Sequence, residues 1–250
     1  MTGRRSAASP PTEANDGDSS STNTSGRNRG TTDTERSDSQ AVYDRIATHF
    51  AQTREYAWPE VESFVDAEAD RRGALGRALD LGCGNGRHAE LLADRGAGVV
   101  GLDVSRGLLA EATQRAADRD FDAAFVHGDA ARLPFEDSAF SHAVYVATLH
   151  HLRPRATRLA SLAEVGRVLE PEGRALVSAW STTHDRFDAD EGFDTTVDWT
   201  LPDGEQVGRF YHIYDPEEFR ADLADAAGIR CVEYRLSSGN CYAVVAPAEP

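Results

Sequence analysis

Three alternating glycines behind an acidic residue have the types and spacing to bind a nucleotide-like ligand. Gly82, Gly84 and Gly86 follow a short apolar stretch that contains Asp80, and a helical pattern begins directly after them. Glycine is needed where a backbone turns sharply or lies against a ligand, because it has no Cβ. A strand, a glycine loop and a helix together form a nucleotide-type binding turn. For the glycines alone, a phosphate-binding turn or a purely structural turn is the alternative.

Two further carboxylates stand at the ends of the next two apolar stretches. Asp103 lies 23 residues after Asp80, and Asp129 stands directly before Ala130. In open α/β sheets, ligands bind at the carboxyl ends of the strands, where such residues meet. Asp103 can accept two hydrogen bonds from a ribose diol, and Asp129 can accept one from an adenine amino group. Taken alone, the first could cap a helix and the second could be a turn residue. Together with the glycines they predict a site for an adenosine cofactor.

Alternating strands and helices are expected to carry these residues to one edge of a sheet. Strands are predicted at residues 77–82, 97–103, 123–127, 142–148, 175–180, 229–236 and 240–246. Continuous apolar strands between helices imply a parallel sheet that is covered on both faces. A short Ser-Ser-Gly turn at residues 237–239 implies an antiparallel hairpin. The predicted fold class is therefore α/β, with seven mostly parallel strands, an antiparallel C-terminal hairpin strand, and helices on both faces.

The segments outside this alternation set the predicted domain boundaries. Residues 1–39 are almost entirely polar and cannot bury enough apolar surface to offset the entropy of ordering, so a disordered tail is expected there. Residues 40–250 are expected to form one domain. Within it, residues 40–70 show two amphipathic helical patterns, which predict a helical pair that packs on the sheet and forms a lid over the cofactor. Residues 181–208 are acidic with few apolar residues, and an irregular insertion is expected.

The charge balance and the cysteines narrow the class of protein. The formal net charge is −16, and all 26 basic residues are arginine. We interpret this lysine-free, acid-rich chain as adapted to high salt, as in halophilic archaea, where a Debye length of ~3 Å screens surface repulsion. Such a charge argues against a generic polyanion binder without excluding a nucleic-acid partner. Three scattered cysteines indicate neither a disulfide framework nor a zinc site. The lack of a long apolar run or signal segment predicts a cytoplasmic protein.

The glycine motif resembles the first motif of class I S-adenosyl-L-methionine (SAM) methyltransferases. Together with Asp103 and the Gly128-Asp129-Ala130 triplet, the resemblance implies a SAM-dependent methyltransferase with the Rossmann-like seven-stranded sheet of that class. It places the glycine loop under the methionine part of SAM, with Asp80 near the amino group. The predicted cofactor-binding residues are Asp80, Gly82, Gly84, Gly86, Asp103, Asp129 and Ala130.

Three other stretches resemble a narrower family, the tRNA wobble-uridine carboxyl methyltransferases, which esterify 5-carboxymethyluridine in the anticodon. They are residues 42–59, 147–151 and 209–214, and the resemblance extends over residues 41–246. It implies the tRNA anticodon loop as substrate and a small zinc-binding methyltransferase activator protein as partner. The long basic insertion of the eukaryotic members is replaced here by a short acidic segment, Asp185 to Gln206.

Arginine, aromatic and histidine side chains in these stretches suit a carboxylate acceptor. A carboxylate is already ionised at neutral pH, so the site needs no general base and has to hold an anion in line with the methyl group. Arginine clamps carboxylates through paired hydrogen bonds, and aromatic rings can stack on a splayed base. The alternative for the histidine pair is a helix cap with a surface residue. The alternative for Tyr211 is a position in the core. The predicted catalytic residues are Arg54, His150, Tyr211 and His212, and the predicted substrate-binding residues are Tyr56, Trp58, His151 and Arg209.

Three arginines form the densest basic stretch of this acidic chain. Arg153, Arg155 and Arg158 directly follow the histidine pair. They are predicted either to contact tRNA phosphates or to be a solvated helix start.

Two other functions remain open from the sequence. A small-molecule methyltransferase, such as a quinone-biosynthesis enzyme, has the turn found at residues 133–138 and the histidine pair, but lacks the stretch from Thr53 to Pro59. A non-catalytic SAM-binding subunit would keep the cofactor site without an acceptor pocket. Methyl transfer to tRNA distinguishes the three functions.

Overall fold

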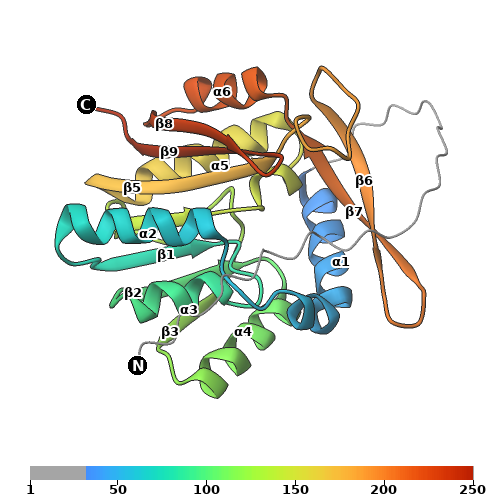
Figure 1. Cartoon of the computed structure of the whole chain (residues 1–250), viewed down its shortest axis with the longest axis horizontal. Helices are drawn as coiled ribbons and strands as arrows, with labels where there is room; N and C mark the ends of the chain where they lie inside the picture. Colours follow the sequence, from blue (N-terminus) through green and yellow to red (C-terminus); the bar gives the residue numbers. More distant parts are fainter. Residues whose placement is uncertain (1–31, 250) are drawn as a thin grey trace, which may run out of the picture. The chain divides into compact units, whose positions relative to one another are not determined.

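The computed structural model describes residues 32–249, and most of the predicted tail, residues 1–31, lies outside them. Figure 1 shows the course of the chain. The described elements run in the order α1 (Thr32–Thr53), α2 (Pro59–Arg72), β1 (Arg77–Leu81), α3 (Arg87–Asp94), β2 (Gly98–Asp103), α4 (Arg106–Arg119), β3 (Ala123–His127), β4 (Phe140–Tyr145), the 3₁₀ turn η1 (Leu149–His151), α5 (Arg155–Val168), β5 (Leu169–Trp180), β6 (Phe193–Thr200), β7 (Gln206–Ile213), α6 (Pro216–Asp225), β8 (Ile229–Ser237) and β9 (Asn240–Pro247).

Seven strands form one sheet in the order β3-β2-β1-β4-β5-β9-β8, as predicted. The strands from β1 to β5 pair in parallel, and β9 runs antiparallel to both of its neighbours. Every residue of β4 is buried, because helices cover both faces of a parallel sheet. β1 lies between β2 and β4, so the strand order changes direction there. Ligands of open α/β sheets bind at this switch point.

Alternate residues of the central strands pack into two cores on opposite faces of the sheet. Leu79 and Leu81 of β1 belong to the core that contains buried residues of α5 and α6, whereas Ala78 belongs to the core with α2 and α3. This separation follows from the two-residue period of a strand. Both faces of the sheet are therefore packed below the carboxyl ends of its strands.

Residues 193–213 form a two-stranded hairpin, so the prediction of an irregular insertion is wrong over these strands. β6 pairs antiparallel with β7, and Val197 lies directly opposite Arg209. Opposite residues share a face of the hairpin, and Asp194 and Asp198 lie on the other face because side chains alternate along a strand. Polar residues take every second position of β6, so the segment has a polar composition although its other face is mostly apolar.

α1 begins at Thr32, before the predicted domain boundary at residue 40. Once a helix exists, each added residue gains a hydrogen bond, so a polar segment can extend an amphipathic helix. α1 packs on α4, where Asp44 accepts hydrogen bonds from the Ser105 hydroxyl at 2.7 Å and the Gly107 amide at 2.9 Å. α2 instead buries its apolar side against the sheet. Of the two helices predicted as a lid, α1 is therefore the one positioned for that role.

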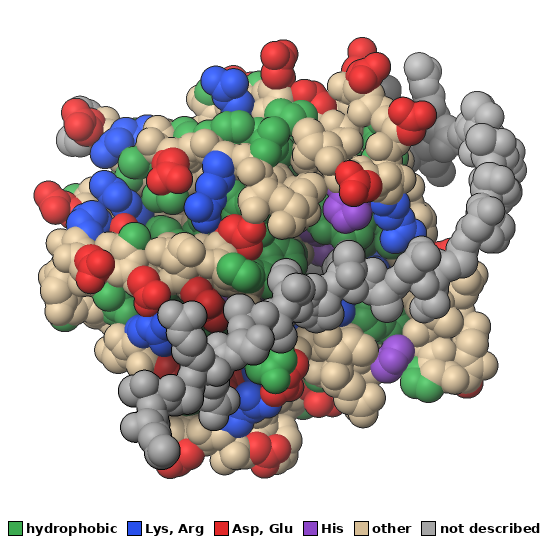
Figure 2. Space-filling model, in the orientation of Figure 1, with side chains coloured by type: hydrophobic (Ala, Val, Ile, Leu, Met, Phe, Trp, Pro, Cys, Tyr) green, Lys and Arg blue, Asp and Glu red, His purple; other side chains and the backbone are tan. Residues whose placement is uncertain are grey.

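The surface mixes acidic and arginine side chains. Figure 2 shows them interspersed over one face, without a broad basic area among the described residues drawn there. A polyanion bound on that face would meet single arginines among carboxylates rather than a continuous positive strip. In the part of the chain that the structure describes, no helix has the length and apolar character to cross a membrane.

Candidate active site

A cavity of about 460 Å³ opens at the carboxyl ends of the central strands, beside the switch point. Its size lies within the range of ~300–1,000 Å³ that is typical of small-molecule sites. The glycine loop after β1, the end of β2, the loops after β3 and β4, and α1 form its walls. The predicted residues that line it are Gly82, Gly84, Asp103, Asp129, Ala130 and His151.

The glycine loop follows a path that only glycine adopts without strain. Gly82, Gly84 and Gly86 have φ angles of 73°, 53° and 77°, in the left-handed region. A Cβ on Gly82 would lie 2.0 Å from the hydroxyl oxygen of Thr148. A Cβ on Gly84 would have only Phe50 nearby, at 3.7 Å, so this glycine leaves the cavity open. Gly86 does not line the cavity, because it caps α3 and packs on α4.

Asp103 is held in position by the loop that it faces. Its Oδ2 accepts a hydrogen bond from the Gly84 amide at 2.9 Å, and its Oδ1 accepts one from the Ser105 amide at 2.8 Å. Each carboxylate oxygen keeps a further lone pair for a ligand hydroxyl. Burial raises the pKa of Asp103, and the two amide donors oppose that rise. The fixed carboxylate suits the ribose diol for which it was predicted.

Asp80 lies below the glycine loop and does not line the cavity. It is buried, and its Oδ2 has no hydrogen-bond partner among the described residues. Burial, followed by the charge of nearby Asp103, raises the pKa of Asp80 to about 7. Two carboxylates close together under the loop favour a cationic ligand. SAM carries a positive sulfonium and an ammonium group, so the residues of this site fit SAM, with Asp80 acting through its charge.

The loop after β3 contributes two more predicted residues to the cavity wall. Asp129 Oδ1 accepts a hydrogen bond from the Ala131 amide at 2.9 Å, which makes a local turn. The carbonyl of Ala130 accepts one from the Ser161 hydroxyl at 2.8 Å, which ties the loop to α5. Asp129 is thus a turn residue on the cavity wall, and a carboxylate there is an acceptor of the type that a ligand amino group needs.

Asn85 is a site residue that the sequence analysis missed. Its buried side-chain amide donates hydrogen bonds to the carbonyl oxygens of Ala51 at 3.3 Å and Arg54 at 2.8 Å. These carbonyls lie at the end of α1, where helical carbonyls need partners outside the helix. The polar residue inside the glycine motif therefore holds α1 against the cofactor loop. Its presence was visible in the sequence, but its partners in α1 were not.

Tyr43 is a second missed residue, and it joins the cavity to the predicted acceptor residues. Nδ1 of His151 lies 2.8 Å from the Phe210 carbonyl and must donate to it, so Nε2 accepts the hydrogen bond of the Tyr43 hydroxyl at 2.8 Å. Burial lowers the pKa of His151 to about 3. Burial also raises the pKa of Tyr43, whereas hydrogen bonds from Arg209 and Tyr211 oppose that rise. Tyr43 therefore connects three of the predicted acceptor-site residues.

His150 supports this group from behind and does not line the cavity. It is buried, and its ring stacks on Tyr211 with the centroids 4.8 Å apart. Its Nδ1 accepts the Trp180 amide hydrogen at 3.1 Å. Burial lowers the pKa of His150 well below its usual value. The structure therefore corrects the prediction of a catalytic, substrate-facing His150: the side chain positions Tyr211.

Two predicted arginines meet at one indole ring. The guanidinium carbon of Arg54 lies 5.3 Å from the ring centroid of Trp199 and 5.3 Å from that of Phe50. The guanidinium carbon of Arg209, which is buried, lies 4.9 Å from the Trp199 centroid and 5.2 Å from that of Tyr211. Phe50 lines the cofactor cavity, so both cations lie close behind its wall. Trp199 was missed because the sequence analysis placed it in an irregular insertion.

Two of the three aromatic residues predicted to stack on a base, Tyr56 and Trp58, lie on the connection between α1 and α2, outside the cavity wall; the third is Tyr211 of β7. The Tyr56 side chain is 75% exposed. Trp58 packs partly on the sheet core, with the Arg87 guanidinium carbon 5.2 Å from its ring centroid and the His88 ring at 6.4 Å. The exposed ring of Tyr56 is therefore the more accessible surface for a base.

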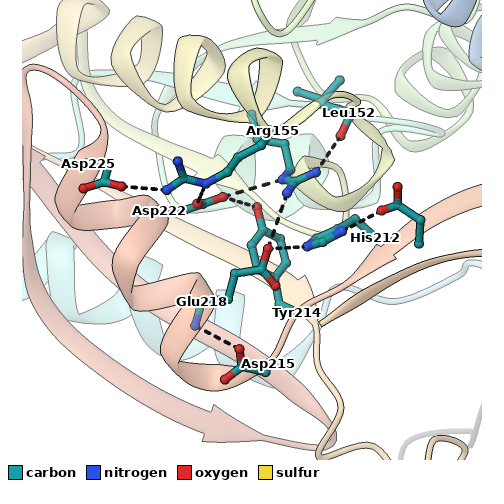
Figure 3. Close-up of polar contacts among 10 residues, drawn as sticks. Leu152, Arg155, His212, Tyr214, Asp215, Glu218, Asp222 and Asp225 are labelled. Carbon is teal, nitrogen blue, oxygen red and sulfur yellow. Dashed lines mark hydrogen bonds and ion pairs between the residues drawn. The ribbon is translucent and has the colours of Figure 1, made fainter. Parts of the chain in front are cut away.

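His212 is separated from the pocket, which corrects its predicted catalytic role. Its Nδ1 lies 2.7 Å from Asp194 and its Nε2 lies 2.8 Å from Glu218, as Figure 3 shows for the α6 side. Successive side chains of a strand point to opposite faces, so Tyr211 and His212 of β7 cannot both face the cavity. His212 instead links the β6–β7 hairpin to α6.

Arg155 and Arg158 face α6, which corrects their predicted contact with tRNA phosphates. Arg155 donates hydrogen bonds to Asp222 at 2.6 Å and to Asp225 at 2.7 Å (Figure 3). Arg158 is buried, with its Nε 3.6 Å from the Asp222 carboxylate. Both arginines therefore join α5 to α6. Arg153, in contrast, lines the cavity.

Comparison with known proteins gives several methyltransferase relatives. The family described as a methyltransferase domain matches residues 78–173. A candidate methyltransferase of Encephalitozoon cuniculi is 30% identical over 209 residues, which cover 81% of this chain and 92% of that protein. The tRNA (carboxymethyluridine(34)-5-O)-methyltransferase of Saccharomyces cerevisiae is 32% identical over 165 residues, which cover 64% of this chain and 56% of that protein. A demethylmenaquinone methyltransferase of Beutenbergia cavernae is 35% identical over 191 residues, which cover 72% of this chain and 75% of that protein.

The fold is also found in solved structures. The CcbJ methyltransferase from Streptomyces caelestis superposes with a TM-score of 0.69 at 20% identity, covering 85% of this chain and 99% of that one. Some relatives are much longer than this chain. It spans 20% of the Xenopus tropicalis protein and 32% of the Arabidopsis thaliana protein that carry the same tRNA methyltransferase name.

Proposed function

We propose a specific acceptor for this chain, which belongs to the SAM-dependent methyltransferase family. The acceptor is the carboxylate of 5-carboxymethyluridine at the tRNA wobble position, and the product is its methyl ester. Relatives named for this activity support the proposal, with 32% identity to the yeast protein and 35% to the Xenopus protein.

The observation that carries the proposal is the pair of arginines behind the cavity wall. Arg209 is buried on the mostly apolar face of the β6–β7 hairpin, and Arg54 approaches the same indole ring from the end of α1. Arg209 also hydrogen-bonds the hydroxyl of Tyr43, which lines the cavity. Guanidinium groups recognise carboxylates through paired, charge-assisted hydrogen bonds. The pair therefore suits an anionic acceptor next to the methyl donor.

The protonation of the nearby histidines agrees with an acceptor that needs no deprotonation. Burial lowers the pKa of His151 to about 3, and its Nε2 already accepts the Tyr43 hydrogen. His150 is likewise held neutral by burial. Neither side chain is a strong base at neutral pH. When bound, SAM supplies the electrophilic methyl group, and the residues of this chain hold an ionised acceptor oxygen in line with it and exclude water.

A small-molecule acceptor is the second candidate. The demethylmenaquinone methyltransferase relative is 35% identical and is covered over 75% of its length. An acceptor of that class would use the same cofactor cavity, and its transfer reaction would not depend on the two arginines as a carboxylate clamp.

One transfer experiment separates these functions. The protein, with an activator protein supplied, is incubated with labelled SAM and with either tRNA from a strain lacking this methyltransferase or a lipid extract. Label in 5-methoxycarbonylmethyluridine is the expected result. Label in the lipid extract alone would support the second candidate. Binding of SAM without transfer to either would indicate a non-catalytic SAM-binding subunit.

We also propose where the small zinc-binding activator would join. Among residues 32–249, β3 is one edge of the sheet and pairs with β2 alone, and an exposed strand edge can accept a further strand. The loop that follows β3 lines the cavity, so a partner at this edge would contact the wall of the cofactor site. Co-elution and increased transfer activity are expected when the activator is added. If the activator does not co-elute and the transfer activity is the same with and without it, this partner is excluded.

A further inference from the structure

Trp199 contacts both arginines of the proposed acceptor site. We infer that Trp199 positions Arg54 and Arg209 as one carboxylate-binding pair, an inference that rests on the proposed function. The ring lies on the same hairpin face as Arg209, because Trp199 pairs with Val207 and Arg209 is the next residue of β7 on that face. A one-residue slip in register would move the ring to the acidic face. The hairpin pairing therefore determines which side chains meet.

A hydrogen bond from the other side of the site fixes the orientation of the indole. Trp199 Nε1 donates to His49 Nδ1 at 3.1 Å, and the two rings meet edge to face with centroids 5.5 Å apart. His49 belongs to α1, as does the Phe50 ring, which lies 5.5 Å from Trp199. Trp199 is thus held between the hairpin and the helix that carries Arg54 at its end.

The indole face favours two cations at once. A guanidinium over a tryptophan ring is attracted by the negative face of the ring, and the attraction grows when the site is desolvated. Two guanidinium groups at one ring also repel each other, and an anion that bridges them is attracted to both. Phe50 is shared between this ring and the cofactor cavity, so the pair stands one aromatic side chain from the cavity. This arrangement has the charge and the position to select a carboxylate.

The charge preference of the site is the property that Trp199 should control. Two anticodon stem-loops, one with 5-carboxymethyluridine and one with its neutral amide, 5-carbamoylmethyluridine, measure that preference as a ratio of dissociation constants. S-adenosylhomocysteine is present so that no transfer occurs. Trp199→Leu is expected to lower the preference for the carboxylate about tenfold, the equivalent of about 1.4 kcal/mol. Trp199→Phe keeps a ring and is expected to retain most of the preference.

Kinetics and a matched control separate positioning from a general loss of structure. In transfer assays, Trp199→Leu should raise the KM for the carboxylate stem-loop more than it lowers kcat, with the dissociation constant for SAM unchanged. Phe193→Leu removes a ring from the same hairpin face at its far end, where it packs on Phe187 at 5.7 Å, and should leave the preference unchanged. Should Trp199→Leu fail to fold, His49→Ala releases the indole and is expected to lower the preference about threefold.

The outcomes are distinct. The role of Trp199 is overturned if the wild-type protein methylates the carboxylate stem-loop and the Trp199 or His49 variant keeps the full preference for the carboxylate. An equal loss of affinity for both stem-loops would also overturn it, because that result indicates a structural role alone. A wild-type protein that methylates neither stem-loop shows instead that the proposed function is wrong.

Discussion

Replacing Asp103 by Asn tests the cofactor site with almost no change in side-chain shape. The carboxylate accepts amide hydrogens from Gly84 and Ser105, one on each oxygen. Asparagine has a single oxygen, so its NH₂ group must face one of these donors, and the remaining oxygen can serve only part of a ribose diol. The substitution therefore removes both the charge and half of the acceptors.

The expected loss follows from the value of hydrogen bonds to charged groups. Such bonds contribute about 1.5–3 kcal/mol each, against about 1 kcal/mol for neutral pairs. Loss of one ribose bond and weakening of the other amount to about 3 kcal/mol, or roughly a 100-fold rise in the dissociation constant for SAM.

Isothermal calorimetry with SAM and S-adenosylhomocysteine measures this change, and thermal unfolding checks that the variant folds. Asp118→Asn is the matched control, because Asp118 is exposed on α4 and only accepts a hydrogen bond from Gln114. A dissociation constant for Asp103→Asn within about threefold of the wild type would refute the assignment of Asp103 to the ribose.

Four further predictions address the acceptor group, the charge under the glycine loop and the α5–α6 contact. Arg54→Ala should abolish transfer to tRNA and change SAM affinity by less than about threefold; retained activity would exclude a carboxylate clamp. Tyr43→Phe removes the hydroxyl that donates to His151, and it should lower kcat/KM about tenfold at unchanged SAM affinity; an unchanged kcat/KM would contradict its central position. The pKa of Asp80 is raised to about 7, so its negative charge is gained as the pH rises through that value, and the affinity for cationic SAM should rise in step. Calorimetry at several pH values should show this slope in the wild type and a flatter one in Asp80→Asn, and equal slopes would exclude the effect. Asp222→Ala removes one of the two carboxylates that lie 3.6 Å from buried Arg158, the other being Glu218, and it also removes the acceptor of the buried Tyr214 hydroxyl. Urea titration should therefore show a loss of about 3–5 kcal/mol in unfolding free energy; a loss below about 1 kcal/mol would mean that these contacts are not stabilising.

The sheet and the cofactor side of the site could be predicted because their signals are local. A position that needs a left-handed φ, such as residue 82, requires glycine, and the sequence shows that glycine directly. Asp103 and Asp129 mark strand ends, and parallel strands bring their carboxyl ends to the same edge. No knowledge of distant contacts is needed to place these residues together.

The acceptor side depends on pairings that a sequence does not display. Tyr211 and His212 point to opposite faces of β7 because side chains alternate along a strand. Which of the two faces the acceptor group follows from the pairing of β7 with β6, which the sequence does not display. Trp199 was hidden because aspartate and threonine residues are interspersed with the apolar ones along β6. Tyr43 looked like an ordinary residue of an amphipathic helix, and its hydrogen bond to His151 joins residues 108 positions apart.

The chemical nature of the product tests the proposed acceptor most directly. The protein is incubated with methyl-labelled SAM, an activator and an anticodon stem-loop that carries 5-carboxymethyluridine, and the recovered RNA is treated with mild alkali. A carboxyl methyl ester is hydrolysed under these conditions, so the label should leave the RNA as methanol. Label that stays on the RNA after alkali, or no label in the RNA at all, would contradict carboxylate methylation.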